Sequence, residues 1–452
     1  MAANRIDATR GAIVPQILRY SYPLILSTLV QSLFSAVDVA VLGNMADSTA
    51  VASVGATGAV TSLLVNAFVG FSSGTKILLA RFIGARDQEK IRSTADTAVL
   101  LSLLCGLLVA VLGWVLSPTI LHLTNCPESC FDGATLYLRI YFTAAPAILL
   151  YNFCSSILTA AGNTRSPLLY MLLGGGLNLV LNIILCLILP NKVLAVAIAT
   201  AASQLLGAAL TLTRLCGGKD AVRLQPLRMR WSGHALLKIL TQGLPIGLVN
   251  VLYPLANLQI QSALNSYGVA AIAGNSASAT LENVSNACHA NLSAATGVFM
   301  GQNLGAQQHD RVKRTLFHGL WLAPLTGLVI GLSMYLSGRF WLNLILPGDT
   351  EAADYAMVRM GCILAFHFVA GFNGVLSHFL QSFGYAFLSS LNSIVCVLGF
   401  RFVWMTWIYP RHENFFMLMV CYLISWLLML TTNFCMSAVV YARYRKGHYK
   451  VL

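Results

Sequence analysis

Charged residues are scarce in this chain. Asp, Glu, Lys and Arg make up 10% of its 452 residues, whereas a soluble domain carries roughly 25%. No Gly-x4-Gly-Lys-Ser/Thr loop occurs, so the usual phosphate cradle of nucleotide-driven proteins is missing. These absences disfavour a soluble fold, and they disfavour ATP as the direct energy source unless another subunit supplies it.

Apolar residues dominate the chain instead. They make up 57% of it, and stretches of about 18 residues or more, long enough to cross a bilayer as a helix, recur throughout. The first stretch contains Pro23, Gln31 and Asp38 and is too long for the core of a signal peptide. The sequence therefore predicts an all-α membrane protein with twelve transmembrane helices. The predicted spans are 15–43, 51–80, 93–117, 134–161, 166–190, 193–216, 237–265, 269–301, 312–337, 352–382, 386–410 and 414–441.

The net charge of +13 has a topological explanation. If the N-terminus is cytoplasmic, most of the 28 Lys and Arg residues fall in segments on the inner side of the membrane. Several acids, among them Glu128, Asp132 and Asp354, fall in outer loops. This bias predicts a multi-pass protein of the cell (plasma or inner) membrane with both termini cytoplasmic. It also disfavours nucleic acid as a partner.

Cysteine is more frequent than expected, with eleven residues, most of them inside predicted spans. There they act as small apolar packing residues. Cys126 and Cys130 lie in a predicted outer loop, and the sequence leaves open whether they pair. Their spacing fits no usual metal site.

The chain is internally duplicated. Segment 72–85 (SSGTKILLARFIGA) is echoed about 221 residues later by segment 293–306 (SAATGVFMGQNLGA), and Gly162 is matched by Gly384. Duplicated polytopic proteins are typical of secondary transporters, which hold substrate between the repeats. Because each repeat has an even number of spans, we predict two six-helix bundles related by a pseudo-twofold axis along the membrane normal. The predicted parts are a cytoplasmic N-terminal segment (1–14), an N-lobe (15–216), a cytoplasmic linker (217–236), a C-lobe (237–441) and a basic cytoplasmic tail (442–452).

Asp38 and Glu282 are the two acids that lie well inside predicted spans. A charge at the bilayer centre costs about 2.5–3.5 kcal/mol on insertion scales, so its presence suggests a use. Asp38 shares a polar helix face with Gln31 and Ser35. Upstream, Pro23 removes a backbone hydrogen bond and is a candidate hinge. The alternative for Asp38 is a structural carboxyl bonded to a neighbouring helix.

Glu282 belongs to a longer polar face in the eighth span, from Asn275 to Thr296, which includes His289. Such a face either lines a cavity or packs on another polar helix. The other polar faces fit interhelical packing as well as ligand binding, and together they indicate a wet interior. They consist of Asn178 and Asn182; of Asn250, Tyr253, Asn257, Gln261 and Asn265; and of Asn373, Ser377 and Gln381.

Lys76 and Arg401 are the cations that we expect to be buried. Lys76 lies near the cytoplasmic end of its helix, from which a long side chain reaches the interface. Arg401 lies deeper, and the sequence assigns it no partner.

Several short motifs follow one another in a characteristic order. They are Pro23 fifteen residues before Asp38, Val51–Gly55 (VASVG), Gly84-Ala85, Gly243-Leu244-Pro245, Leu281-Glu282-Asn283 and segment 301–306 (GQNLGA). At this spacing they resemble the multidrug and toxic compound extrusion (MATE) family over residues 15–441. The last two motifs are most similar to the bacterial branch named for DNA-damage-inducible protein F.

The resemblance implies two bundles that form a V and open alternately to the two sides of the membrane. It implies a secondary active antiporter, not an enzyme, that exports amphipathic, often cationic, organic compounds in exchange for H⁺ or Na⁺. The family's coupling acid falls on Asp38. The family often has an Asn followed by an Asp four residues later on helix 5; here Asn178 and Asn182 occupy these positions. Positions that are acidic in other branches, near Tyr253 and Asn373, are neutral here, which weakens the case for Na⁺.

The predicted site combines these polar faces with the resemblance. Asp38, Asn178 and Asn182 are the candidates for cation coupling, and Pro23 is the candidate hinge. Na⁺ at Asp38 is the one metal option, and we predict no cofactor. The expected partners are small organic substrates and the lipid bilayer, around a monomer. The predicted substrate-cavity residues are Gln31, Ser35, Asn152, Tyr253, Asn257, Gln261, Glu282, His289 and Asn373.

Two other functions fit parts of the sequence. A lipid-linked oligosaccharide flippase of the same superfamily usually has extra helices and a cationic cavity, whereas Arg401 is the one candidate cavity cation here. An intramembrane enzyme needs a convergent catalytic set at a membrane face, and the two longest outer loops (117–135 and 346–354) offer scattered acids with His122 as their one histidine. The sequence therefore favours the antiporter.

Overall fold

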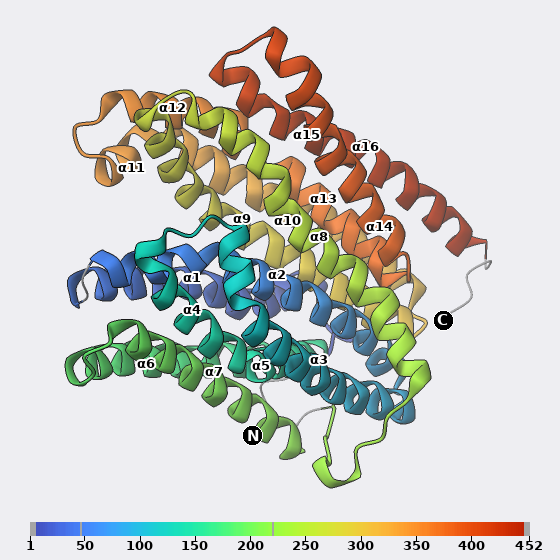
Figure 1. Ribbon diagram of the computed structural model, residues 1–452. Helices are drawn as coiled ribbons and strands as arrows, with labels where there is room; N and C mark the ends of the chain where they lie inside the picture. The colour runs from blue at the N-terminus through green and yellow to red at the C-terminus, as the bar shows by residue number, and fades with distance from the viewer. Residues whose placement is uncertain (1–5, 46–47, 219–220, 447–452) are drawn as a thin grey trace. The chain divides into compact units, whose positions relative to one another are not determined.

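The computed structural model describes residues 6–45, 48–218 and 221–446, apart from the side chains of residues 35–40, 42, 44 and 45. Figure 1 labels its helices. Within the described residues every regular element is a helix, which confirms the all-α prediction. The chain divides into two compact units. The first comprises residues 22–243 and a short segment that ends at Asp7, and the second comprises residues 8–21 and the chain from Leu244 onward.

Helix α1 (Ile13–Met45) crosses from one unit to the other, because the division falls between Ser21 and Tyr22. The predicted span 134–161 consists of two helices bent by 46°. Pro146, near the start of the second of them, has no N–H with which to continue the preceding helix. The helices of the first unit after α1 are α2 (Ser48–Ala85), α3 (Gln88–Leu123), α4 (Glu128–Thr143), α5 (Ala145–Ala160), α6 (Arg165–Ile188) and α7 (Lys192–Cys216), followed by the short η1 (Pro226–Arg228).

The second unit is built mainly from four long continuous helices and two interrupted ones. The predicted span 352–382 is broken by a short 3₁₀ turn, and the span 386–410 contains two π-helical stretches around a short α-helix. The continuous helices are α8 (Gly233–Asn265), whose residues up to Gly243 belong to the first unit, α9 (Val269–Gly305), α10 (His309–Leu336) and α16 (Phe415–Arg445). The remaining elements are α11 (Gly338–Ile345), α12 (Thr350–Cys362), η2 (Leu364–Phe366), α13 (His367–Ser382), α14 (Ala386–Ser393), η3 (Ile394–Gly399), α15 (Phe400–Val403), η4 (Trp404–Ile408) and η5 (Tyr409–Arg411).

The duplication seen in the sequence is also present in the backbone. Arg86 and Gln307, which directly follow the two echoed segments, have left-handed φ angles of 56° and 58°. Gly162 and Gly384, which follow α5 and α13, have φ angles of 84° and 87°. A left-handed residue commonly ends a helix, and glycine adopts that conformation without a side-chain clash. The two halves therefore share their turn geometry as well as their motifs.

Most of the long helices have the length and apolarity of membrane spans. Among the described residues, nine helical segments have both properties singly, and the bent pair α4–α5 adds a tenth. Helices α1, with 33 residues, and α9, with 37, are not among these segments, but they are long enough to span and correspond to the other two predicted spans. On α3, Leu107, Leu108 and Val111 are 56%, 59% and 62% exposed, as expected for side chains that face lipid.

Residues 8–11 are held by α9 and α10 of the second unit. Arg311 of α10 donates hydrogen bonds to the carbonyls of Ala8 and Gly11, both at 2.8 Å. The Gln302 side chain accepts from the N–H of Ala8, and the Asn303 side chain donates to its carbonyl, each at 3.2 Å. Both side chains belong to the GQNLGA motif. One role of that motif is therefore to attach the start of the chain to the second unit.

Candidate functional site

Each unit contains a polar cavity. The larger one, about 450 Å³, is lined by residues of α8, α9, α13, α15 and α16 and is called the C-cavity here. The smaller one, about 310 Å³, is lined by residues of α1, α2, α5, α6 and α7 and is called the N-cavity. Both volumes fall within the range of small-molecule pockets, about 300–1,000 Å³.

The acid of the C-cavity is held in an ion pair. Glu282 of α9 receives a hydrogen bond from Arg359 of α12, with 2.5 Å between Oε2 and Nη2. The Nη1 of Arg359 donates to the hydroxyl of Ser278, one helical turn before Glu282, at 2.9 Å. Both charged side chains are mostly removed from solvent, with 7% of Arg359 and 22% of Glu282 exposed. Glu282 therefore lines the cavity with its charge already matched by a buried guanidinium.

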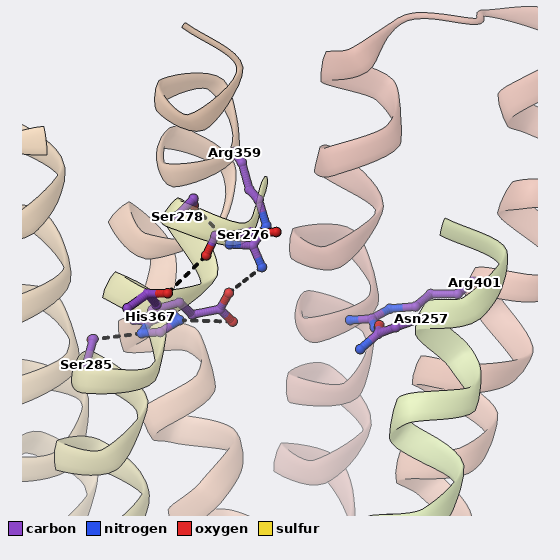
Figure 2. A network of polar contacts seen from close by, with 9 residues as sticks. Asn257, Ser276, Ser278, Ser285, Arg359, His367 and Arg401 are labelled. Carbon is purple, nitrogen blue, oxygen red and sulfur yellow. Dashed lines mark hydrogen bonds and ion pairs between the residues drawn. The ribbon is translucent and has the colours of Figure 1, made fainter. Parts of the chain in front are cut away.

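A histidine completes this network, as Figure 2 shows. The Nε2 of His367, the first residue of α13, lies 3.8 Å from Oε1 of Glu282. Its Nδ1 lies 2.8 Å from the hydroxyl of Ser285. The polar face of α9 therefore does both things that the sequence left open: one part packs on other helices, and another part lines a cavity. Ser278 and Ser285 pack against α12 and α13, whereas Glu282 and His289 line the cavity.

Arg359 and His367 were not predicted as site residues. Lys76 and Arg401 were the expected buried cations, yet Arg359 is buried as well. Its position inside the predicted span 352–382 is the sequence signal for a buried charge. The pairing with Glu282 has no sequence signature, because the two residues come from different helices.

Arg401 also lines the C-cavity, and the structure shows partners for it that the sequence did not assign. It lies on the four-residue α15, between the π-helical segments η3 and η4. Its Nη1 donates to Oδ1 of Asn257 at 2.7 Å, as Figure 2 shows. Its Nε donates to the Ser425 hydroxyl at 3.3 Å, and its guanidinium carbon lies 4.1 Å from the ring centre of Tyr422. These three partners are uncharged.

His289 of α9 lines the C-cavity as well and is 3% exposed. Neither of its ring nitrogens has a hydrogen-bond partner among the described residues. Its ring lies edge-on to that of His367, with 5.1 Å between the centroids. A buried polar group normally has a partner, so this histidine offers an unused hydrogen-bonding group to the cavity.

The remaining predicted residues of the second unit fall into two groups. Tyr253, Asn257 and Asn373 line the C-cavity. Asn373 also donates to the carbonyl of Trp426 at 2.9 Å, so it fixes α13 against α16 as well. Gln261 lines neither cavity; it is exposed and donates to Asn265 at 3.0 Å, one turn further along α8.

Three of the predicted residues of the first unit line the N-cavity. They are Gln31, Asn152 and Asn178. Asn182 is buried one turn beyond Asn178 on α6 and donates to its Oδ1 at 3.0 Å. The two asparagines therefore form a connected pair, with Asn178 as the member at the cavity.

Three further predictions concern α1. Asp38 and Ser35 lie on this helix, but their side chains are outside the described residues, so their roles stay predictions. Pro23 lies within α1 two residues after the unit boundary, and its carbonyl accepts a hydrogen bond from the Ser27 hydroxyl at 2.8 Å. A hinge at Pro23 likewise stays a prediction.

No group of three or more His, Cys, Asp or Glu residues within the described ranges could hold a metal ion. Cys126 and Cys130 are free thiols, with 3.8 Å between their sulfur atoms. Among the described residues the site is therefore built from amides, hydroxyls, imidazoles and one matched ion pair, with Arg401 as the added charge.

A duplicated protein with nine long apolar helical segments and one bent pair among its described residues, and with a polar cavity in each unit, has the architecture of a membrane transporter. The model of the MatE family matches two stretches of the chain, residues 23–186 and 245–406. These stretches begin at the equivalent prolines Pro23 and Pro245. The chain therefore belongs to the MatE family, whose members are multi-pass membrane transporters and not enzymes.

Individual relatives agree with this assignment. The chain is 25% identical over 384 residues to "Probable multidrug resistance protein YoeA" of Bacillus subtilis (strain 168), covering 83% of each chain. It is also 25% identical over 380 residues to "Probable multidrug resistance protein YpnP" of the same organism, covering 84% of each. The fold is similar to that in the "Crystal structure of MATE in the bent conformation". The TM-score is 0.89 at 21% identity, over 97% of this chain and 98% of the other.

Proposed function

We propose that this chain is a secondary active multidrug exporter that moves amphipathic organic compounds out of the cell in exchange for H⁺. The relatives named as multidrug resistance proteins support the export of varied compounds. The two polar cavities, one in each unit, offer binding places for such compounds while the protein opens alternately to the two sides of the membrane. By the charge bias of the sequence, both termini are cytoplasmic.

The ion pair between Glu282 and Arg359 is the observation that supports Asp38 as the coupling acid. An acid whose charge is matched by a buried guanidinium releases and binds protons poorly, because protonation would leave the arginine unpaired. Of the two acids predicted deep inside spans, this leaves Asp38 to exchange a proton. A cationic substrate near an ionised Asp38 would compete with that proton for one charge.

The driving force is sufficient for this exchange. One proton that moves down a potential of about 100 mV gains roughly 2.3 kcal/mol. One pH unit adds about 1.36 kcal/mol. Since each 1.4 kcal/mol corresponds to a factor of ten, one proton supports a gradient of a few hundredfold for a neutral substrate.

The test is ethidium efflux from proteoliposomes driven by a pH gradient, with the wild type, Asp38→Asn and Asp354→Asn. Asp354 is exposed and pairs with Arg339, so its variant is the matched control. We expect Asp38→Asn to abolish pH-driven efflux and Asp354→Asn to leave it unchanged. Undiminished efflux in Asp38→Asn would exclude this mechanism.

The coupling ion is tested separately. Transport is measured in Na⁺-free buffer with a pH gradient, and then with a Na⁺ gradient at fixed pH and fixed potential. The neutral pair Asn178 and Asn182 supports H⁺, because a Na⁺ site normally includes charged oxygen ligands. Efflux that follows the Na⁺ gradient alone would establish Na⁺ as the coupling ion.

A further inference from the structure

We propose that the C-cavity binds the anionic group, a carboxylate or a phosphate, of an aromatic organic compound, with Arg401 as its charged ligand. The proposal of a binding site is based on the geometry of the second unit. The claim that its ligand is exported cargo rests on the proposed function. The expectation of often cationic cargo, which the family resemblance implied, would then apply to the first unit and not to this cavity.

The charge balance of the C-cavity is the first support. Glu282, the acid on its wall, is matched by Arg359 at 2.5 Å. Arg401 is 2% exposed and forms no ion pair with any residue that the structure describes; its partners are Asn257, Ser425 and the ring of Tyr422. A buried cation is costly unless an anion accompanies it. The cavity therefore carries a net positive charge that an anionic ligand would complete.

Unused donors are the second support. The Nη2 of Arg401 has no hydrogen-bond partner among the residues described, since the hydrogen bonds of this side chain come from Nε and Nη1. His289, which lines the same cavity from α9, has no partner for either ring nitrogen in the described part of the chain. A neutral imidazole still carries one N–H donor. Guanidinium and imidazole donors together suit the two or three oxygens of a carboxylate or phosphate.

The other side chains that line the C-cavity indicate the chemistry of the rest of the ligand. Tyr253, Tyr422, Trp426 and Met429 line the C-cavity beside the polar groups. Aromatic and thioether side chains bind flat apolar rings through area burial and ring contacts. A volume of about 450 Å³ accommodates a compound of drug size. The ligand is therefore an aromatic compound that carries an acidic group.

The backbone around Arg401 is unusual in a way that agrees with a ligand site. Two π-helical stretches, η3 and η4, flank the single turn of α15 that carries this residue. Such insertions in α-helices are found frequently at functional sites, because they change the direction in which a side chain points. The N-cavity offers a contrast, since no Lys or Arg is among the residues that line it.

The experiment compares two fluorescent probes with the same ring system. Fluorescein carries a carboxylate and is anionic at pH 8, whereas rhodamine 6G is a cation without a free carboxylate. Binding of each probe to the purified full-length protein in a neutral detergent is measured by fluorescence anisotropy. We expect fluorescein to bind the wild type and Arg401→Gln to weaken that binding about 10- to 100-fold, the range for a lost hydrogen bond to a charged group. The affinity for rhodamine 6G should not fall.

Three further variants keep the test decisive. Arg401→Lys keeps the charge and should retain part of the fluorescein affinity. His289→Phe removes only a neutral donor and should weaken binding severalfold, which provides a second measurement if Arg401→Gln does not fold. Arg339→Gln alters an exposed arginine that pairs with Asp354 and should change nothing. Unchanged fluorescein affinity in both Arg401→Gln and His289→Phe would overturn the proposal, as would an equal loss of both probes.

Competition distinguishes the sources of the anionic group. Naphthyl phosphate should displace fluorescein, and a short-chain phosphatidylglycerol should displace it less effectively. Stronger displacement by the lipid would overturn the assignment to an aromatic compound. Ethidium efflux from proteoliposomes made with the same purified protein separates the two proposals. Efflux without fluorescein binding would refute the proposed anion site but not the proposed export. Fluorescein binding without any efflux would refute the proposed export but not the anion site.

Discussion

Arg359 on α12 and Glu282 on α9 lie 77 residues apart in the chain and form an ion pair, with 2.5 Å between Nη2 and Oε2. The pair connects two helices of the second unit at the wall of the C-cavity. It removes from the cavity the negative charge that the sequence alone would assign to it. What the cavity then presents to a ligand is the charge of Arg401.

Removing Arg359 should destabilise the protein strongly. We expect Arg359→Gln to lower the free energy of unfolding by about 3–5 kcal/mol, because it leaves the Glu282 carboxylate buried and unpaired. The double variant Arg359→Gln/Glu282→Gln should recover most of this loss, since neither charge remains. Thermal unfolding of the detergent-solubilised protein measures both effects.

The control for this prediction is Arg339→Gln. Arg339 pairs with Asp354, and both side chains are more than half exposed, so the loss should be below about 1 kcal/mol. If the double variant proved as unstable as the single one, the charge of Glu282 would not be the cause, and the prediction would be wrong.

The start of the chain should detach when Arg311 is replaced. This residue donates to the carbonyls of Ala8, Arg10 and Gly11. Hydrogen bonds from a charged group contribute about 1.5–3 kcal/mol each, so Arg311→Gln should make trypsin cleavage after Arg10 about tenfold faster or more. Lys313→Gln, an exposed cation on the same helix, is the control. Equal cleavage rates in Arg311→Gln and the wild type would contradict this role.

Asp87 should stabilise the start of α3 in a pH-dependent manner. A side-chain hydrogen bond from Lys90, together with the backbone N–H of the same residue, holds the pKa of Asp87 below its usual value. Because the pKa is lower in the folded state, the stabilisation is present above about pH 3.9 and is lost as the pH falls through the folded pKa.

Asp87→Ala should therefore lower the free energy of unfolding by about 1 kcal/mol at pH 7, the usual contribution of an N-cap. The difference from the wild type should shrink below about pH 4. Asp87→Asn keeps an oxygen that can cap the helix and should lose less. Unfolding measured at pH 7 and at pH 3 checks both variants. A stability difference from the wild type that is larger at pH 3 than at pH 7 would contradict the predicted pH dependence.

The twelve helices could be predicted from the sequence because the length of an apolar run is a local property. The bend between α4 and α5 was not predicted, although Pro146 is the residue that explains it. The interruptions around Arg401 were not predicted either, since η3 and η4 contain no Pro. They depend on how the whole segment packs against its neighbours.

The candidate site was predicted less completely. Helix periodicity and the family resemblance together predicted five residues of the second unit that do line the C-cavity: Tyr253, Asn257, Glu282, His289 and Asn373. Gln261 was predicted with them but is not among the residues that line it, because the face of α8 that it shares with Asn257 extends past the end of the cavity. Periodicity shows which residues share a face, but it does not show where along the helix a partner helix stops.

The sequence by itself determined that this chain is a duplicated bundle of membrane-spanning helices with polar faces turned inward. Hydropathy, charge bias and internal repetition are all properties of the chain in order, and they require no knowledge of contacts. The tertiary structure alone decided which polar groups neutralise one another. Glu282 meets Arg359 and Arg401 meets Asn257 because particular helix faces pack together. The charge that remains at the C-cavity is the result of that pairing.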